Sequence, residues 1–262
     1  GKILVERALE LDYALWAGTE SSSNDKHAMQ QAVDSCDLDQ VIGGTIRCGI
    51  GTYNVSDIHV PSNVKIIGSG NGYDLGTIEG SRREGTTFEM VDGDWTIFKI
   101  HSRRGDEYPR NIHISNCGIS LDGQTSDYAH CVYVGGRAGV DGTSYITSLE
   151  KNTFHGGTGT GPLVWFNGDE DSSQIGWETI GNVLKQNIFI SPHDGVGMRV
   201  NSENSSFHLE ANTAVCGRGS SIAFDFVRAG WTTVINPDSR GWAFDGYHSE
   251  YTFEREITSV TL

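Results

Sequence analysis

The sequence is poor in basic residues, in proline and in long apolar runs. Its 19 lysines and arginines face 34 aspartates and glutamates, and the formal net charge is -15. Phosphate backbones repel so acidic a surface, so nucleic acid is excluded as a partner. No apolar run approaches the roughly 18–20 residues that cross a bilayer, so no membrane span is predicted.

The few basic residues are mostly arginine, and lysine is scarce. Many carboxylates with few lysines are typical of proteins that stay hydrated in strong salt. Self-repulsion costs little there, because the Debye length at 1 M is only about 3 Å. One interpretation is therefore a halophilic protein, and the other is an ordinarily acidic protein of the extracellular space or of a virion surface.

Cysteine is present, but no two cysteines form a C-x-x-C pair. The sequence therefore does not predict a structural zinc site. The number of cysteines is odd, and several stand in apolar strand contexts, so we expect buried free thiols. A disulfide between Cys36 and Cys48 is the alternative. The five are Cys36, Cys48, Cys117, Cys131 and Cys216.

The chain divides into an N-terminal segment, 1–23, and a repetitive domain, 24–262. Ile3–Trp16 has apolar residues at mixed spacing and suits either a helix or a strand that leads into the domain. A short helix is predicted over 25–36, with Ser23 or Asn24 as its N-cap. Its predicted apolar face is Ala28, Met29, Ala32 and Val33.

Two signatures recur in the domain at intervals too long for hairpins. One is Leu-x-x-Asn-x-apolar, which contains Asn152, Asn187 and Asn212. The other is a short strand with an apolar residue on each side of a central one. These central residues recur every 26 to 34 positions, and they are Lys99, Tyr133, Trp165, Arg199 and Asp225.

This repeat predicts an all-β fold, a right-handed single-stranded parallel β-helix with a short N-terminal capping helix. Alternate apolar residues of each coil would point inward and stack on the next coil, about 4.8 Å away. Asn suits the bends, because it tolerates left-handed geometry and bonds nearby backbone. We expect about seven coils. The helix would cover the first coil, whose open edge is an aggregation hazard.

Four segments resemble the N-terminal signature of the pectate-lyase-like β-helix superfamily. They are Asn24–Asp34, Gly43–Ile46, Gly51–Tyr53 and Val60–Gly70. That superfamily includes virus tailspikes, polysaccharide lyases, glycoside hydrolases and epimerases. The resemblance implies the fold and a carbohydrate ligand. Among tailspikes it also implies a homotrimer. It does not select one activity, because one fold hosts many.

The five central residues are predicted to face solvent and to bind a glycan. Aromatic faces pack on sugar rings, and arginine and aspartate bond hydroxyl or carboxylate groups. The predicted substrate-binding row is Lys99, Tyr133, Trp165, Arg199 and Asp225. The alternative is a solvated strand face that happens to hold large side chains.

The turns that follow these strands carry Asp169 and Glu203, a candidate catalytic pair. Carboxyl groups about 5–5.5 Å apart suit a retaining glycosidase, and roughly 6.5–9.5 Å suits an inverting one. The run Asp169–Asp171 is also read as an acidic surface loop. As a third reading it is a site for a divalent cation such as calcium, because hard cations take clustered oxygens.

A second catalytic candidate is the segment Ser191–Gly195. It resembles the Asp-Pro-His-acid motif of mannuronan C5-epimerases, in which the histidine abstracts the C5 proton of a uronate. Here His193 and Asp194 match that motif. Ser191 replaces its first aspartate, and Ile188 stands where the family has an upstream tyrosine. The alternative is a polar turn between coils.

The sequence thus predicts a carbohydrate-directed β-helix that belongs to a virion spike or surface module and binds a host or envelope polysaccharide. Two alternatives remain, which are a free polysaccharide lyase, hydrolase or epimerase and a structural coil without ligand. No cofactor is expected other than a divalent cation such as calcium, which the run Asp169–Asp171 could bind. The net acidity disfavours a polyanionic substrate unless salt or bound cations screen it.

Overall fold

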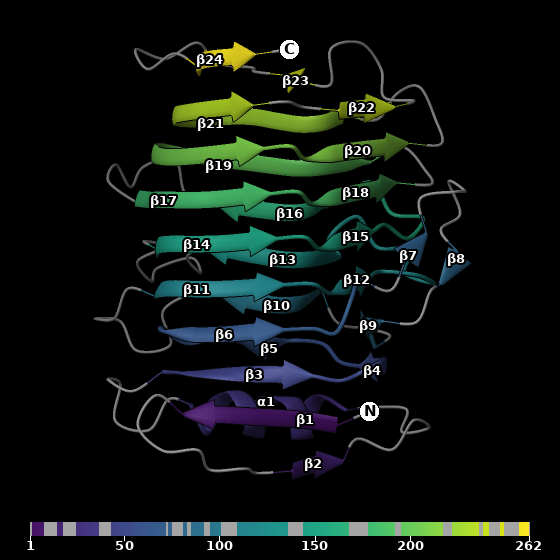
Figure 1. Ribbon diagram of the computed structural model, residues 1–262. Helices are drawn as coiled ribbons and strands as arrows, with labels where there is room; N and C mark the ends of the chain where they lie inside the picture. Colours follow the sequence, from purple (N-terminus) through teal and green to yellow (C-terminus); the bar gives the residue numbers. More distant parts are fainter. Residues whose placement is uncertain are drawn as a thin grey trace.

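The computed structural model of the chain describes most of the coil and parts of the segments around it (Figure 1). The described residues are 2–7, 15–17, 25–36, 43–71, 73–74, 81–82, 85–91, 95–100, 109–135, 144–167, 178–191, 195–216, 222–235, 238–240, 247–248 and 257–261.

The chain winds as a right-handed parallel β-helix with three faces. The first face holds β5 (Ile58–His59), β10 (Thr96–Ile100), β13 (His130–Gly135), β16 (Pro162–Asn167), the start of β19 (Val196–Glu210), the start of β21 (Ile222–Ile235) and β23 (Tyr247–His248). The second face holds β3 (Gly44–Cys48), β6 (Val64–Ile67), β11 (Arg110–Ser115), β14 (Ser144–Glu150), β17 (Glu178–Lys185), the later parts of β19 and β21, and β24 (Ile257–Thr261). The third face holds β4 (Gly51–Asn54), β9 (Thr86–Glu89), β12 (Gly118–Ser120), β15 (Thr153–His155), β18 (Ile188–Ser191), β20 (Thr213–Cys216) and β22 (Asp238–Arg240).

Each coil passes once through each face, and every strand pairs in parallel with its equivalent in the next coil. Within the described part of the chain, the third face is a sheet of seven strands, which agrees with the expected number of coils. The predicted fold is confirmed. Antiparallel pairs join β1 (Lys2–Arg7) to β2 (Leu15–Ala17) and to β3, and β7 (Tyr73–Asp74) to β8 (Ser81–Arg82).

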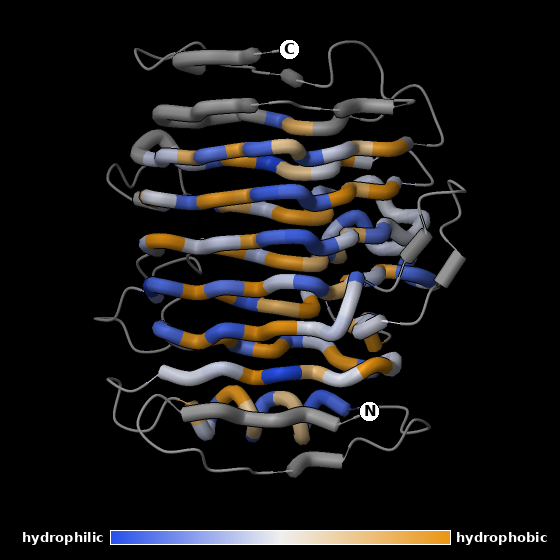
Figure 2. The backbone as a smooth tube through the Cα atoms, viewed as in Figure 1, coloured by the Kyte–Doolittle hydropathy of each residue, from blue (hydrophilic) through white to orange (hydrophobic). Residues whose placement is uncertain are grey.

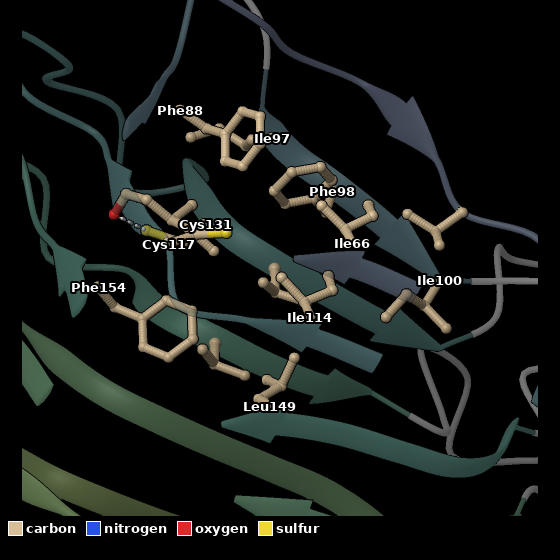
Figure 3. Close-up of a cluster of buried hydrophobic side chains, with 14 of the residues drawn as sticks. Ile66, Phe88, Ile97, Phe98, Ile100, Ile114, Cys117, Cys131, Leu149 and Phe154 are labelled. Atoms are coloured by element: carbon tan, nitrogen blue, oxygen red, sulfur yellow. Dashed lines mark hydrogen bonds between the residues drawn. The ribbon is translucent and has the colours of Figure 1, made fainter. Parts of the chain in front are cut away.

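The interior is a column of apolar side chains from all three faces. Hydrophobic and hydrophilic residues alternate along the strands (Figure 2), as a strand with one buried face requires. Side chains from different faces of the coil then meet inside (Figure 3), where Phe88 of β9 packs edge-on against Phe98 of β10 at 5.1 Å between ring centroids. Side chains from successive coils also meet, since Phe154 of β15 stacks on Phe189 of β18 within the third face, at 5.0 Å between ring centroids.

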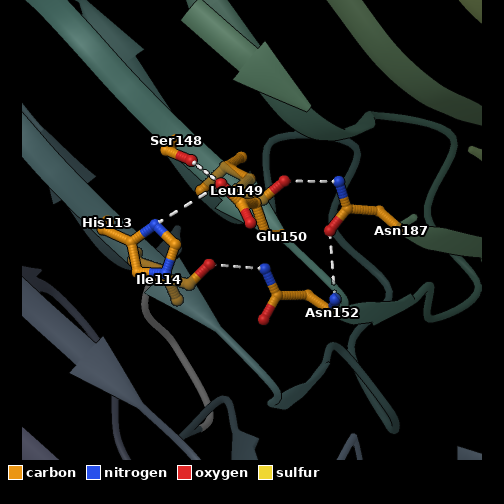
Figure 4. Close-up of polar contacts among 7 residues, drawn as sticks. All are labelled: His113, Ile114, Ser148, Leu149, Glu150, Asn152 and Asn187. Carbon is orange, nitrogen blue, oxygen red and sulfur yellow. Dashed lines mark hydrogen bonds and ion pairs between the residues drawn. The ribbon is translucent and has the colours of Figure 1, made fainter. Parts of the chain in front are cut away.

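A ladder of buried asparagines runs along the turn between the second and third faces. The Asn152 Oδ1 accepts a hydrogen bond from the Cys117 N–H at 3.1 Å, and the Asn187 Oδ1 accepts one from the Asn152 N–H at 3.0 Å (Figure 4). The Asn212 Oδ1 continues the ladder to the Asn187 N–H. The side-chain amide of Asn187 also donates to the carbonyl of Leu149 at 2.6 Å. The ladder satisfies backbone groups that would otherwise be buried without partners.

The left-handed positions of this turn lie one residue earlier than the sequence suggested. Asn116, Lys151, Gln186 and Ala211 take φ of 55°, 55°, 54° and 51°. Asn152, Asn187 and Asn212 follow them and contribute hydrogen bonds rather than left-handed geometry. Asn116 differs from these three asparagines, since it occupies the left-handed position itself.

The predicted capping helix is α1 (Lys26–Asp34), which buries Met29, Ala32 and Val33 beneath the first coils. Its N-cap is Asp25, not Ser23 or Asn24, and the Asp25 side chain makes no capping hydrogen bond. Instead its Oδ2 accepts the N–H of Asn54 at 3.0 Å. That carboxylate therefore ties the helix start to the third face.

Four cysteines are buried free thiols, as predicted, and the alternative disulfide between Cys36 and Cys48 is absent. Burial raises the pKa of Cys48 to about 12, and it also raises the pKa of Cys117 and of Cys131. These thiols remain protonated at neutral pH and act as small apolar side chains. The side chain of Cys216 lies outside the described set.

In the described segments, no helix is long and apolar enough to cross a membrane.

Candidate functional site

The five predicted binding residues form one continuous row on the first face. Lys99 pairs with Tyr133, Tyr133 with Trp165, Trp165 with Arg199, and Arg199 with Asp225 in adjacent strands. The residues that flank them, such as Val132 and Val134, belong to the core. Because successive side chains of a strand alternate between its faces, the row points outward. We call these five residues the outward row.

The outward row is less accessible than the sequence suggested. Tyr133 is only 2% exposed and Asp225 is also buried, so the expectation of a solvent face is wrong for both. Trp165 is partly exposed. Aromatic neighbours outside the predicted set account for much of the cover over Tyr133, and they form a cluster with it.

Trp95 and His130 complete this aromatic cluster. The Trp95 ring meets Tyr133 edge-on with centroids 4.9 Å apart, and Tyr133 meets Trp165 at 5.5 Å. The His130 ring contacts both tryptophans, and its centroid lies 5.0 Å from that of Trp165 and 6.2 Å from that of Trp95. Trp95 is 38% exposed and is therefore the most accessible ring of the four. Edge-to-face contacts of this kind are favourable, because ring edges are positive and faces negative.

His130 is held in one tautomer by the next coil. Its Nδ1 lies 2.7 Å from the carbonyl oxygen of Pro162, which can only accept, so Nδ1 carries the proton. Burial, together with the charge of Arg199, lowers the pKa of His130 to about 4, against the opposing effect of the Pro162 carbonyl. His130 is therefore neutral at neutral pH, and its Nε2 is a hydrogen-bond acceptor.

The two cations of the outward row are each paired with a carboxylate. The Lys99 ammonium contacts Asp57 and also lies 4.3 Å from the centroid of the Trp95 ring. The Arg199 Nε donates to the Asp225 Oδ2 at 2.7 Å. Burial alone would raise the pKa of Asp57, but the ammonium groups of Lys99 and Lys26 outweigh it and lower that pKa.

Amide side chains extend the row at the carboxyl ends of its strands. The Asn201 amide donates to the Asn167 Oδ1 at 3.2 Å, and the Asn167 amide donates to the Tyr133 hydroxyl at 3.3 Å. Gly135 is paired with Asn167 in the neighbouring strand, and a Cβ atom at position 135 would lie 1.9 Å from the Asn167 carbonyl oxygen. The site therefore combines amides, aromatic rings and paired charges, with Trp95 and Trp165 as its accessible rings, and such a set suits polar ligands with apolar ring faces.

Sequence reasoning missed Trp95, which lies just before β10, and His130, for which the reason is definite. Strict alternation through β13 would turn His130 inward and Cys131 outward. In the structure Cys131 and Val132 both enter the core, so the alternation breaks at the start of the strand. His130 is thereby left beside Trp165. The sequence does carry a signal for both residues. An aromatic ring stands shortly before each of two successive central residues, with Trp95 before Lys99 and His130 before Tyr133.

None of the four predicted catalytic side chains is among those that the structure describes. Asp169, His193 and Asp194 lie outside the described residues. Glu203 belongs to β19, but its side chain is not described. The catalytic role of these four residues stays a prediction. No three His, Cys, Asp or Glu side chains of the described set gather as metal ligands. The run Asp169–Asp171, which carries the calcium prediction, lies outside that set.

No protein-family model and no curated protein matches the sequence. Among solved structures, ORF18 of Geobacillus virus E2 is similar to 89% of this chain, with 12% identity and a TM-score of 0.34. The chain spans 58% of the length of that viral protein. The A-module of mannuronan C-5 epimerase AlgE6 from Azotobacter vinelandii is similar to 82% of this chain and is covered over 73% of its own length, with 17% identity and a TM-score of 0.39.

Proposed function

We propose that this β-helix binds a polysaccharide or surface glycan through the outward row and the aromatic cluster beside it. The observation that carries the proposal is that Trp95, Tyr133 and Trp165 lie beside the paired cations Lys99 and Arg199 on one strand face. Sugar rings present C–H faces to aromatic rings and hydroxyl groups to charged and amide side chains. Both kinds of partner stand side by side here.

We further propose that the protein acts outside the cell, as a spike or surface module of a virion, and that it assembles as a homotrimer. The resemblance of its N-terminal segments to the signature of the pectate-lyase-like superfamily, which includes virus tailspikes, supports this. The charge of -15 is compatible with an exposed, hydrated surface. Sedimentation of the purified chain measures the assembly directly. A monomer at micromolar concentration would argue against the trimer without touching the glycan proposal.

The glycan proposal is tested with Trp95→Ala on an array of polysaccharides and oligosaccharides. Trp95 is the accessible ring of the cluster, so its loss should weaken binding by about tenfold or more. This magnitude borrows the roughly 1–3 kcal/mol measured for bases stacked on aromatic side chains. Tyr128→Ala is the matched control, because Tyr128 is 75% exposed and lies outside the row. Equal binding by both variants, or no glycan bound by the wild type, would refute the proposal.

A further inference from the structure

The outward row is locally balanced in charge. Lys99 already contacts Asp57, which Lys26 also approaches at 3.6 Å, and Arg199 already contacts Asp225. A polyanionic ligand would compete with these carboxylates for the same cations. It would also approach a chain whose formal charge is -15. Repulsion of that kind acts at long range and lowers the rate of encounter.

Two buried polar atoms of the aromatic cluster have no hydrogen-bond partner in the part of the chain that the structure describes. They are the Nε1 of Trp165 and the Nε2 of His130. The first can only donate a hydrogen bond. The second is an acceptor, because the bond to the Pro162 carbonyl keeps the proton on Nδ1. His130 is 1% exposed, so its acceptor is kept from water without a partner, which is unfavourable.

A hydroxyl group satisfies both kinds of atom, since it accepts one hydrogen bond and donates another. A carboxylate can only accept. It would match the Trp165 N–H but would set its negative charge against the lone pair of His130. The rings of His130 and Trp165 lie 5.0 Å apart between centroids, so one sugar unit can address both.

We infer that the ligand is a neutral, hydroxyl-rich hexose polymer, and that the His130 Nε2 and the Trp165 Nε1–H form its hydroxyl-binding pair. This inference rests on the proposed function and specifies its substrate class. Both atoms are shielded from solvent, so a ligand reaches them when the Trp95 ring, which is 38% exposed, turns aside while Trp165 stays beside His130. Binding is therefore expected to change tryptophan fluorescence.

Two variants remove one hydrogen bond each and preserve the rest of the site. His130→Asn keeps a side-chain N–H for the Pro162 carbonyl and loses the Nε2 acceptor. Trp165→Phe keeps an aromatic face and loses the donor. The probes are an array of neutral glucan, mannan and galactan oligosaccharides and a matched array of polygalacturonate and alginate oligosaccharides. Circular dichroism confirms that each variant is folded.

We expect the wild type to bind a neutral oligosaccharide and each variant to bind it about three- to tenfold more weakly. Salt should change this affinity little, because the contacts are uncharged. Tighter binding of the uronate oligosaccharides at low salt would overturn the inference. Unchanged affinity in both variants would also overturn it.

The outcomes separate this inference from the function on which it rests. If Trp95→Ala abolishes binding while His130→Asn and Trp165→Phe bind as the wild type does, the glycan surface stands and the hydroxyl-binding pair is wrong. If Trp95→Ala binds as the wild type does, or if no oligosaccharide binds, the proposed function fails and the inference fails with it.

Discussion

At the scale of residues, the backbone of the coil imposes conformations that some side chains resist. Ile146 adopts φ of 58°, in the left-handed region that β-branched residues disfavour. Asn111 in β11 and Gly181 in β17 take φ of 57° and 75° near the corresponding points of their strands. The bend thus recurs in neighbouring coils, and only Ile146 is poorly suited to it.

Ile146→Asn should therefore stabilise the protein by about 1 kcal/mol, because asparagine tolerates the left-handed region. Ile146 is 52% exposed, so little apolar burial is lost. The measurement is the urea midpoint. Ile180→Asn is the control, since Ile180 is 38% exposed but is not in the left-handed region. A gain of stability in the control alone would contradict the strain argument.

His130 also makes stability depend on pH in a predictable direction. Burial lowers its folded-state pKa from 6.5 to about 4, so the folded protein takes up its proton later than the unfolded chain does. The free energy of unfolding should therefore fall as the pH drops from about 6.5 to about 4. The loss due to this one group is on the order of 3 kcal/mol.

The test compares urea unfolding of the wild type and His130→Asn at pH 7.5, 6 and 5. The variant lacks the titrating group, so its stability should fall less steeply than that of the wild type. Parallel curves for the two proteins would show that the acid sensitivity arises elsewhere.

At the scale of elements, the free edge of the first face is closed by a side chain. β5 ends its row of strands, so its outer backbone groups have no strand partner within the described chain. The Gln30 Oε1 accepts the His59 N–H at 2.8 Å, and the Gln30 amide donates to the His59 carbonyl at 3.1 Å. One side-chain amide of α1 thus imitates a neighbouring strand and blunts an edge that would otherwise invite aggregation.

Gln30→Ala should cost about 1–3 kcal/mol, because two backbone groups lose their partner. It should also speed amide exchange at His59 and raise the tendency to aggregate. The matched control is the next residue, Gln31→Ala, whose side chain makes an exposed contact with His27 and should be nearly neutral. Equal unfolding midpoints for the two variants would refute the role of Gln30.

The asparagine ladder is the second device at this scale, and its middle rung, Asn187, is bonded to the coils on both sides of it. Asn187 accepts from the Asn152 N–H and donates to the carbonyl of Leu149 and to the Asn212 Oδ1. Each rung joins adjacent coils at the bend before the third face. The ladder thereby links the strands of the third face to those of the second without any turn glycine.

At the scale of the whole molecule, charge dominates behaviour in solution. The formal charge of -15 is spread over a single elongated coil (Figure 1), so carboxylates repel one another along its length. Paired cations such as Lys185, which lies 2.9 Å from Glu210, relieve only a part of this repulsion.

The melting temperature should therefore rise when KCl increases from dilute to molar, because screening shortens the range of repulsion and salt favours compact states. The rise should shrink near pH 5, close to the sequence pI of 4.9, where the net charge is small. A flat or falling melting temperature at pH 7 would remove the halophilic interpretation and leave ordinary acidity.

The sequence alone determined the coil and the vertical alignment of Lys99, Tyr133, Trp165, Arg199 and Asp225. In a parallel β-helix the repeat interval sets which residues are neighbours, and apolar alternation sets which face they share. Only the tertiary structure decided how that row is covered and paired. His130 reaches it through a break in alternation at the start of β13, Trp95 reaches it from the bend before β10, and Asp57 reaches Lys99 from the bend before β5. Such contacts depend on backbone bends between strands, which a repeat pattern does not encode.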